Sequence, residues 1–144
     1  MIEGIDHIGI AVESIESARG FYEALGLEVE TIEEVPQEGV RVAIIPCGAS
    51  RIELLEPTRD DSPIARFLDR RGPGMHHLCL STGVIFEADE KLRAGGFRVL
   101  RDEPTPGAEG RRVQFIHPGS ASGVLVELSQ RPSRKDSRQD SEES

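Results

Sequence analysis

The sequence has no tryptophan, and aromatic residues make up only 4% of the chain. An aromatic-lined cleft for a flat apolar ligand is therefore disfavoured. Cysteine is also scarce, and both Cys47 and Cys79 lie in apolar, strand-like surroundings. We expect two buried free thiols and no disulfide.

No run of about 18 apolar residues is present, which argues against a membrane-spanning helix. The beginning, MIEGIDHIGIAV, has no basic segment ahead of its apolar residues, so the expected compartment is the cytoplasm. Basic residues are outnumbered by acidic ones, and the formal net charge of -9 argues against a nucleic-acid partner. An anionic small substrate stays open, because a metal ion or a few local cations can dominate a pocket.

Two segments of the sequence read as copies of one strand. Residues 6–12 and 76–82 each alternate apolar with small or polar residues after a histidine, His7 in one and His77 in the other. An amphipathic helix is predicted after each copy; Ser14 caps the first helix and Gly26 ends it. The buried face of that helix is expected to comprise Ile15, Ala18, Tyr22 and Leu25.

Beyond its strand and helix, each of the two sequence repeats continues with three runs that are typical of strands. These runs are 27–33, 40–46 and 51–55 in the first copy, and 97–101, 112–117 and 123–128 in the second. Turn residues at 47–50 and 118–123 join the last two runs of each copy into a hairpin. The second copy is slightly longer, which indicates an insertion around residues 104–110.

A short helix is predicted between the copies, with Ser62 as N-cap, Pro63 at its first position and Gly72 as its end. We therefore expect an α+β fold of two paired βαβββ modules that form a curved mixed sheet. The first module spans 1–58, the linker helix 59–74 and the second module 75–130. The charged tail 131–144 is expected to be disordered.

Four polar residues fall at equivalent places in the apolar strands of the two copies. His7 and His77 lie in the first strands, and Glu53 and Glu127 lie in the last strands. A lone histidine is commonly a core residue, and a lone glutamate commonly faces solvent. Their coincidence in both copies instead favours one shared metal site, because a buried carboxylate is costly unless it is paired or bound to a cation. Nitrogen and oxygen ligands without thiolate favour a divalent ion such as Co, Mn, Ni, Zn or Mg.

The sequence resembles the vicinal-oxygen-chelate (glyoxalase/bleomycin-resistance) superfamily and, within it, the methylmalonyl-CoA epimerase family, over residues 4–130. The resemblance rests on residues 6–12, 52–57, 61–68, 74–78, 115–118 and 123–128. It implies a curved sheet around a metal held by His7, Glu53, His77 and Glu127. It also implies a homodimer and an acyl-CoA substrate. Some members carry a glutamate in the third strand that is thought to act as a base, but Val42 stands there in this chain.

The expected reaction is epimerisation next to a thioester carbonyl. Return of the proton to either face needs two bases, for which we assign Glu127 and Glu53 as the catalytic residues, with Glu38 as a weaker alternative. His76 is expected to be a packing or surface residue, and His117 either meets the substrate carboxylate or caps a turn. The alternative functions are a glyoxalase-type lactoylglutathione lyase and a small-molecule-binding protein without enzymatic activity.

Overall fold

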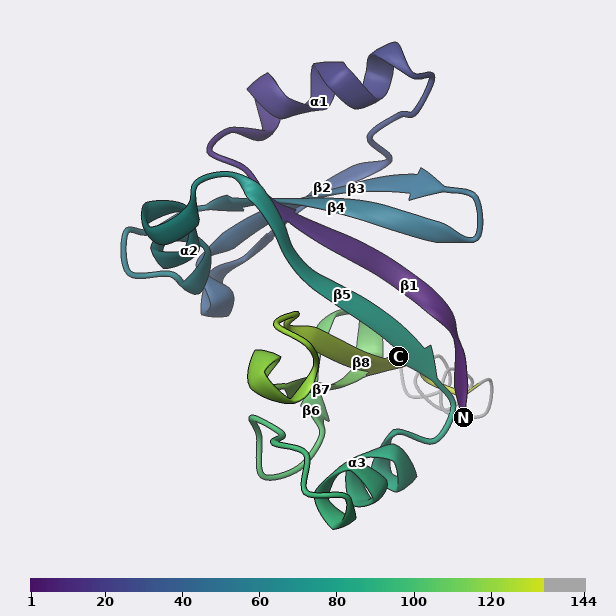
Figure 1. Cartoon of the computed structure of the whole chain (residues 1–144). Helices are drawn as coiled ribbons and strands as arrows, with labels where there is room; N and C mark the ends of the chain where they lie inside the picture. Colours follow the sequence, from purple (N-terminus) through teal and green to yellow (C-terminus); the bar gives the residue numbers. More distant parts are fainter. Residues whose placement is uncertain (134–144) are drawn as a thin grey trace. The chain divides into compact units, whose positions relative to one another are not determined.

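Helices and strands follow one another as expected for two successive βαβββ modules, which confirms the predicted α+β class (Figure 1). The computed structural model describes residues 1–133. The first elements are β1 (Ile2–Ala11), α1 (Ile15–Ala24), β2 (Thr31–Val35), η1 (Pro36–Glu38), β3 (Val40–Cys47), β4 (Ser50–Pro57) and α2 (Pro63–Arg71). The remaining elements are β5 (Gly74–Thr82), α3 (Ile85–Ala94), β6 (Thr105–Pro106), η2 (Ala108–Gly110), β7 (Arg112–Ile116), η3 (Pro118–Ser120) and β8 (Val126–Gln130).

The chain packs as two compact units, and their boundaries fall inside strands β1 and β5. One unit comprises Asp6–Leu78, and the other comprises Met1–Ile5 together with the chain from Cys79 onward. The predicted boundaries of the two modules and the linker helix, 1–58, 59–74 and 75–130, were drawn from the repeat in the sequence, and they remain a prediction. From residue 134 on, the predicted disordered tail lies outside the described residues.

Within the unit Asp6–Leu78, neighbouring strands follow the order β2-β3-β4-β1-β5. Strand β1 runs parallel to β4, and β3 and β4 form an antiparallel hairpin that closes with Cys47 opposite Ser50. The predicted turn at residues 47–50 is therefore confirmed. Because Cys47 stands at this hairpin end, its thiol is exposed, and the prediction that it is buried is wrong. Cys79 is buried as predicted, and neither cysteine forms a disulfide in the described residues.

The two helices of this unit pack on opposite faces of its sheet. Leu54 belongs to a buried cluster with Ile15 of α1, whereas Leu55 belongs to a cluster with Ile64 of α2. Neighbouring residues of a strand point to opposite faces, so α1 covers one face and α2 the other. Glu53 stands two residues before Leu55, and its side chain therefore leaves the sheet on the α2 face.

Helix α1 begins as predicted, because the Ser14 hydroxyl accepts a hydrogen bond from the Ser17 N–H at 3.3 Å. Ile15 is only 3% exposed, but Leu25 is 66% exposed, so the prediction that Leu25 lies on the buried face is wrong. The helix ends at Ala24, and Leu25 is its C-terminal cap. Helical spacing therefore does not place the Leu25 side chain on the face of Ile15.

The predicted linker helix is confirmed as α2. The Ser62 hydroxyl accepts from the Ala65 N–H at 3.1 Å, and Pro63 occupies the first turn. Gly72, with φ of 73°, ends the helix and donates its N–H to the Leu68 carbonyl at 2.8 Å. Both caps were readable from the sequence because they involve residues only a few positions apart.

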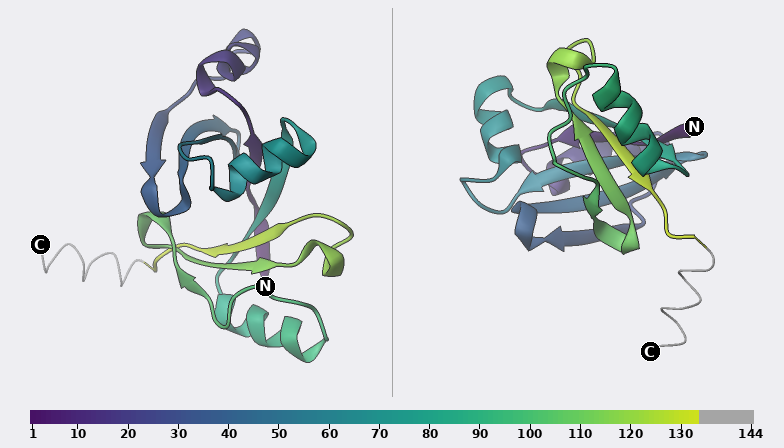
Figure 2. Two further views of the ribbon diagram at one scale, coloured as in Figure 1. Left: turned by 90° about the vertical axis from the view of Figure 1, so that its left-hand side faces the viewer. Right: turned by 90° about the horizontal axis from the view of Figure 1, so that it is seen from below.

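In the other unit, β5, β8, β7 and β6 are successive neighbours, and α3 contacts β7 and β8 (Figure 2). Its core contains Ile85 and Ala88 from α3 with Ile116 and Leu128 from the sheet. Among the described residues, no helix is long and apolar enough to cross a membrane.

Three of the predicted strand runs differ from the structure. Strand β2 begins at Thr31 instead of residue 27, and β8 begins at Val126 instead of residue 123. The run 97–101 forms only an isolated bridge between Val99 and Ile116. Of the described residues in this run, only Leu100 donates its N–H to the neighbouring strand, at the Phe115 carbonyl, whereas the Arg98 N–H donates to the Ser120 hydroxyl and the Arg101 N–H to the Gln114 amide oxygen.

Candidate metal centre

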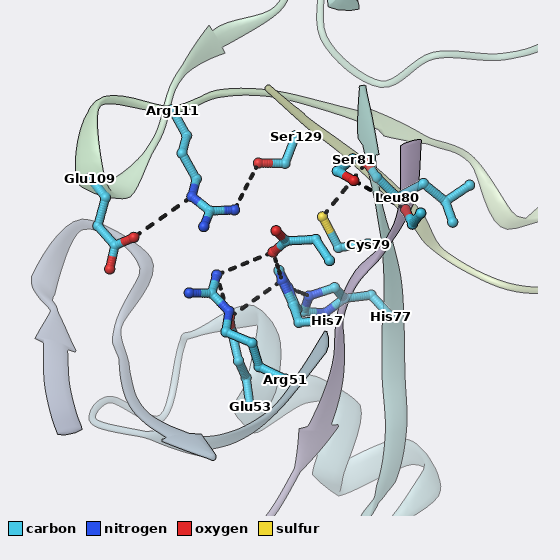
Figure 3. A network of polar contacts seen from close by, with 12 residues as sticks. His7, Arg51, Glu53, His77, Cys79, Leu80, Ser81, Glu109, Arg111 and Ser129 are labelled. Atoms are coloured by element: carbon cyan, nitrogen blue, oxygen red, sulfur yellow. Dashed lines mark hydrogen bonds and ion pairs between the residues drawn. The ribbon is translucent and has the colours of Figure 1, made fainter. Parts of the chain in front are cut away.

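Two buried histidines of the unit Asp6–Leu78 turn their ring nitrogens toward one another. The Nε2 atoms of His7 in β1 and His77 in β5 lie 2.9 Å apart, and the rings meet edge to face (Figure 3). The two residues are 5% and 7% exposed. Neighbouring strands β1 and β5 thus bring together two donors that are far apart in the sequence, as the repeat predicted.

Charged side chains surround the His7 ring. Its Nδ1 lies 2.8 Å from Oδ2 of Asp6 and 3.3 Å from Oε2 of Glu53. The Arg51 guanidinium bridges the same two oxygens, with its Nη2 3.1 Å from Asp6 and 3.2 Å from Glu53 (Figure 3). Burial of two carboxylates is thereby offset by one fixed cation and the imidazole. Asp6, which directly precedes His7, and Arg51, two residues before Glu53, were not predicted as site residues.

Glycine at position 9 makes room for the second histidine. A Cβ atom at Gly9 would lie 2.5 Å from Nδ1 and 2.9 Å from Nε2 of His77, so the ring occupies the space that any other side chain would need. Gly9 pairs with Glu53 across the β1–β4 ladder, which puts the glycine and the carboxylate at one level of the sheet. Sequence reasoning treated Gly9 only as a small residue in an alternating strand.

His76 contacts His77, the residue that follows it. Its Nδ1 lies 3.0 Å from Nδ1 of His77, and its ring packs edge to face on Phe67 of α2 with ring centroids 5.1 Å apart. The expectation that His76 packs is confirmed by the Phe67 contact.

These residues fit a divalent cation. For an octahedral ion with bonds of about 2.1 Å, neighbouring donor atoms stand about 3.0 Å apart. The two Nε2 atoms match that spacing at 2.9 Å, and Glu53 supplies a carboxylate against the same His7 ring, 3.3 Å from its Nδ1 atom. Imidazole nitrogen with carboxylate oxygen suits borderline divalent ions such as Zn, Co or Ni, and also Mn.

The fourth predicted ligand lies in the other compact unit. Glu127 is in β8, half-buried and opposite Phe115 of β7. Its membership of the metal site stays a prediction. In the same unit His117 caps the turn η3, because its Nδ1 accepts from the Gly119 N–H at 2.9 Å. Arg111 is held by the Ser129 hydroxyl at 3.4 Å and by Glu109 at 3.7 Å (Figure 3).

Val42, which stands where the family resemblance implies a possible second base, lies in apolar surroundings. Val42 pairs with Leu55 across β3 and β4 and packs in the cluster under α2. Glu33 of β2 pairs directly with Val42, so its exposed side chain leaves the sheet on the same face as Glu53. Glu38, the weaker alternative from the sequence, is exposed in the turn η1.

Comparison with known proteins places this geometry in a family. The profile of the glyoxalase/bleomycin resistance protein/dioxygenase superfamily matches residues 6–115. The chain is 41% identical to the mitochondrial methylmalonyl-CoA epimerase of Bos taurus over 128 residues, which cover 88% of this chain and 73% of that protein. It is also 41% identical to the ethylmalonyl-CoA/methylmalonyl-CoA epimerase of Cereibacter sphaeroides, over 90% of this chain and 99% of that protein.

Solved structures agree with the sequence comparison. A variant of the Streptomyces coelicolor methylmalonyl-CoA epimerase, in complex with 2-nitronate-propionyl-CoA, superposes with a TM-score of 0.86 at 38% identity and covers 92% of this chain and all of that one. The chain therefore belongs to the glyoxalase/bleomycin resistance protein/dioxygenase superfamily and, within it, to the methylmalonyl-CoA epimerase family.

Proposed function

We propose that this protein interconverts the two epimers of methylmalonyl-CoA by removing and returning the proton on the carbon between the thioester and the carboxylate. The observation that carries the proposal is the convergence of His7 and His77, with Glu53 against the His7 ring, in a chain of this family. The relatives named as epimerases support this reaction over the glyoxalase-type alternative. The buried polar cluster disfavours the alternative of a non-enzymatic small-molecule-binding protein, which would need an apolar cleft.

A divalent cation would be held by His7, Glu53, His77 and Glu127. When bound, it supplies a positive charge next to the thioester and carboxylate oxygens of the substrate, where the negative charge of the enolate develops. The Nε2 atoms of the two histidines contribute nitrogen ligands, and strands β1 and β5 fix their separation. Cobalt, manganese, nickel, zinc and magnesium are the candidate ions.

Proton transfer is assigned to the carboxylates of Glu127 and Glu53. An epimerase needs a proton acceptor on each face of the reacting carbon, because the proton leaves one face and returns on the other. Glu53 lies in a cluster with Asp6 and Arg51, whose guanidinium keeps the Glu53 carboxylate on the α2 face of the sheet. Val42 has no carboxylate, so Glu33 and Glu38 are tested as the other candidates for the second base.

Deuterium exchange of each purified substrate epimer in D2O tests the assignment. Wild-type protein loaded with metal should exchange both epimers. Glu53→Gln and Glu127→Gln should each slow exchange of at least one epimer by about 100-fold or more, since a positioned acid–base group contributes that much. Metal content is measured on the same samples, which separates loss of a base from loss of a ligand.

Three further variants complete the exchange experiment. Glu16→Gln removes a carboxylate that is 81% exposed at the start of α1 and should exchange both epimers like the wild type. Glu33→Gln and Glu38→Gln should do so as well. If Glu53→Gln and Glu127→Gln both exchange both epimers at wild-type rates, the two-base assignment is wrong, and a loss in Glu33→Gln would transfer the role to that residue.

The assembly proposed for the protein follows from the resemblance to its family. We infer a homodimer in the cytoplasm with an acyl-CoA substrate and no nucleic-acid or membrane partner. Sedimentation of the purified protein at several concentrations tests the dimer, which should appear at twice the chain mass of 15.8 kDa.

A further inference from the structure

The residue that precedes each ligand histidine contacts the Nδ1 atom of that histidine. Asp6 lies 2.8 Å from Nδ1 of His7, and His76 lies 3.0 Å from Nδ1 of His77. The pairs Asp6–His7 and His76–His77 stand at equivalent positions of the repeat. The Nε2 atoms of both histidines are thereby left to face one another. The same relation thus occurs twice, once with a carboxylate and once with an imidazole.

The protonation pattern of the rings decides whether the two Nε2 atoms can bind a cation. A neutral imidazole carries one N–H and one lone pair, and only the nitrogen with the lone pair is a ligand. A proton held at Nδ1 by a hydrogen-bond acceptor leaves the lone pair at Nε2. A carboxylate such as Asp6 accepts, so it favours the Nδ1–H form of His7. A neutral His76 also accepts through Nδ1 when its own proton is on Nε2.

We propose that Asp6 and His76 are the paired positioning residues of the metal centre: each accepts the Nδ1–H of the histidine that follows it and so directs that histidine's Nε2 lone pair to the cation. This inference rests on the proposed metal site. Asp6 is itself fixed by Arg51, whose Nη2 lies 3.1 Å from the oxygen that contacts His7. His76 is fixed by its edge-to-face contact with Phe67 of α2.

The two positioning residues differ in charge, which makes the two ligands unequal. The Asp6 carboxylate attracts the Nδ1 proton of His7 and makes that ring a stronger electron donor. His76 has no such charge when neutral, so His77 is the weaker donor and depends more on correct orientation. Helix α2 supplies that orientation through Phe67, which connects the linker helix to the metal centre.

Isothermal titration of metal-free protein with Zn²⁺ and Co²⁺ tests the role of His76. His76→Phe keeps a ring against Phe67 but removes the acceptor, and metal affinity should fall about 10- to 100-fold. His76→Asn restores an acceptor oxygen near the position of Nδ1, and its affinity should return to within a few-fold of wild type. In Zn²⁺-loaded protein, NMR should detect a slowly exchanging His77 Nδ1–H in wild type and in His76→Asn, but not in His76→Phe.

A matched control makes the same histidine-to-phenylalanine substitution at a different position. His117→Phe removes the ring that caps η3 and should leave metal affinity unchanged. Wild-type affinity in His76→Phe, or an equal loss in His76→Asn and His76→Phe, would overturn the role of His76 as acceptor while leaving the metal site standing. A wild-type protein that binds neither ion would instead overturn the proposed site together with its positioning residues.

Discussion

At the scale of single residues, the candidate site depends on an absent side chain as well as on the polar ones. The His77 ring lies directly over Gly9, and the ring of His7 lies between Asp6, Glu53 and His77. The backbone of Gly9 does not need glycine for its own conformation, because its φ is outside the left-handed region. Glycine is required there by the neighbouring ring.

Replacing Gly9 tests whether the neighbouring His77 ring requires glycine at this position. In Gly9→Ala the new Cβ would overlap the His77 ring, so the ring must turn and its Nε2 must leave the neighbourhood of His7. We expect Zn²⁺ affinity to fall by about 10-fold or more, since reorienting a ligand has effects of that order, with the secondary structure retained. Titration calorimetry measures the affinity, and circular dichroism monitors the fold.

The control for this substitution is Gly20→Ala in helix α1. A Cβ at Gly20 meets no atom within 4 Å, so alanine fits without strain. The free energy of unfolding should rise by roughly 0.5–1 kcal/mol, because alanine has the higher helix propensity, and metal affinity should not change. Undiminished Zn²⁺ binding by Gly9→Ala would show that the His77 ring is not held in a ligand position by the space over Gly9.

At the scale of elements, the helices were readable from the sequence in their starts and less so in their ends. Ser14 and Ser62 cap α1 and α2 as predicted. Leu25 has the spacing of the buried helical face but follows the last helical residue, so its side chain lies in solvent. The periodic spacing of apolar residues does not indicate at which residue the helix ends.

Two alanine substitutions, one in α1 and one at its C-terminal cap, test which of the two side chains is buried. Ile15→Ala should lower the free energy of unfolding by about 2–5 kcal/mol, because it removes a buried side chain from the cluster with Leu54. Leu25→Ala should change it by no more than about 0.5 kcal/mol, as for exposed positions. Urea denaturation of both variants provides the comparison. Equal losses in the two variants would mean that Leu25 is covered in solution, for example by a second copy of the chain.

At the scale of the whole molecule, metal binding should stabilise the fold. The ligands predicted for the site come from strands that begin and end the chain's two repeats, and an ion bound only by the folded state shifts the unfolding equilibrium. At a free ion concentration of 100 times the dissociation constant the gain is about 2.7 kcal/mol. Such a gain should raise the melting temperature by about 5 to 10 °C.

Thermal melts with and without chelator check the effect for each candidate ion. Wild-type protein should melt at a higher temperature with the preferred ion and return to its lower value after chelation. His77→Ala lacks one of the two converging nitrogens, so its melting temperature should not respond. A wild-type melting temperature that none of the five ions changes would contradict a metal centre in the folded protein.

Much of the fold and part of the site followed from local patterns in the sequence. The repeat indicated His7, Glu53 and His77 as partners; the structure places the Nε2 atoms of the two histidines 2.9 Å apart and Glu53 against the Nδ1 atom of His7. Asp6, His76 and Arg51 were not assigned, because their contacts depend on how neighbouring side chains turn, which alternation does not describe. The run 97–101 was predicted as a strand because apolar residues recur in it, but the backbone N–H groups of Arg98 and Arg101 donate to side-chain oxygens and the run forms only an isolated bridge.

The sequence by itself determined the duplicated βαβββ order, the helix caps of Ser14 and Ser62, and the kinds of residue available to bind a metal. These features depend on residues within a few positions of one another or on equivalence between the two copies. The tertiary structure alone decided that the His7 and His77 nitrogens meet over Gly9 and that Arg51 joins Asp6 to Glu53. Such contacts arise from strand order, register and side-chain orientation, which bring distant residues together through packing of the whole sheet.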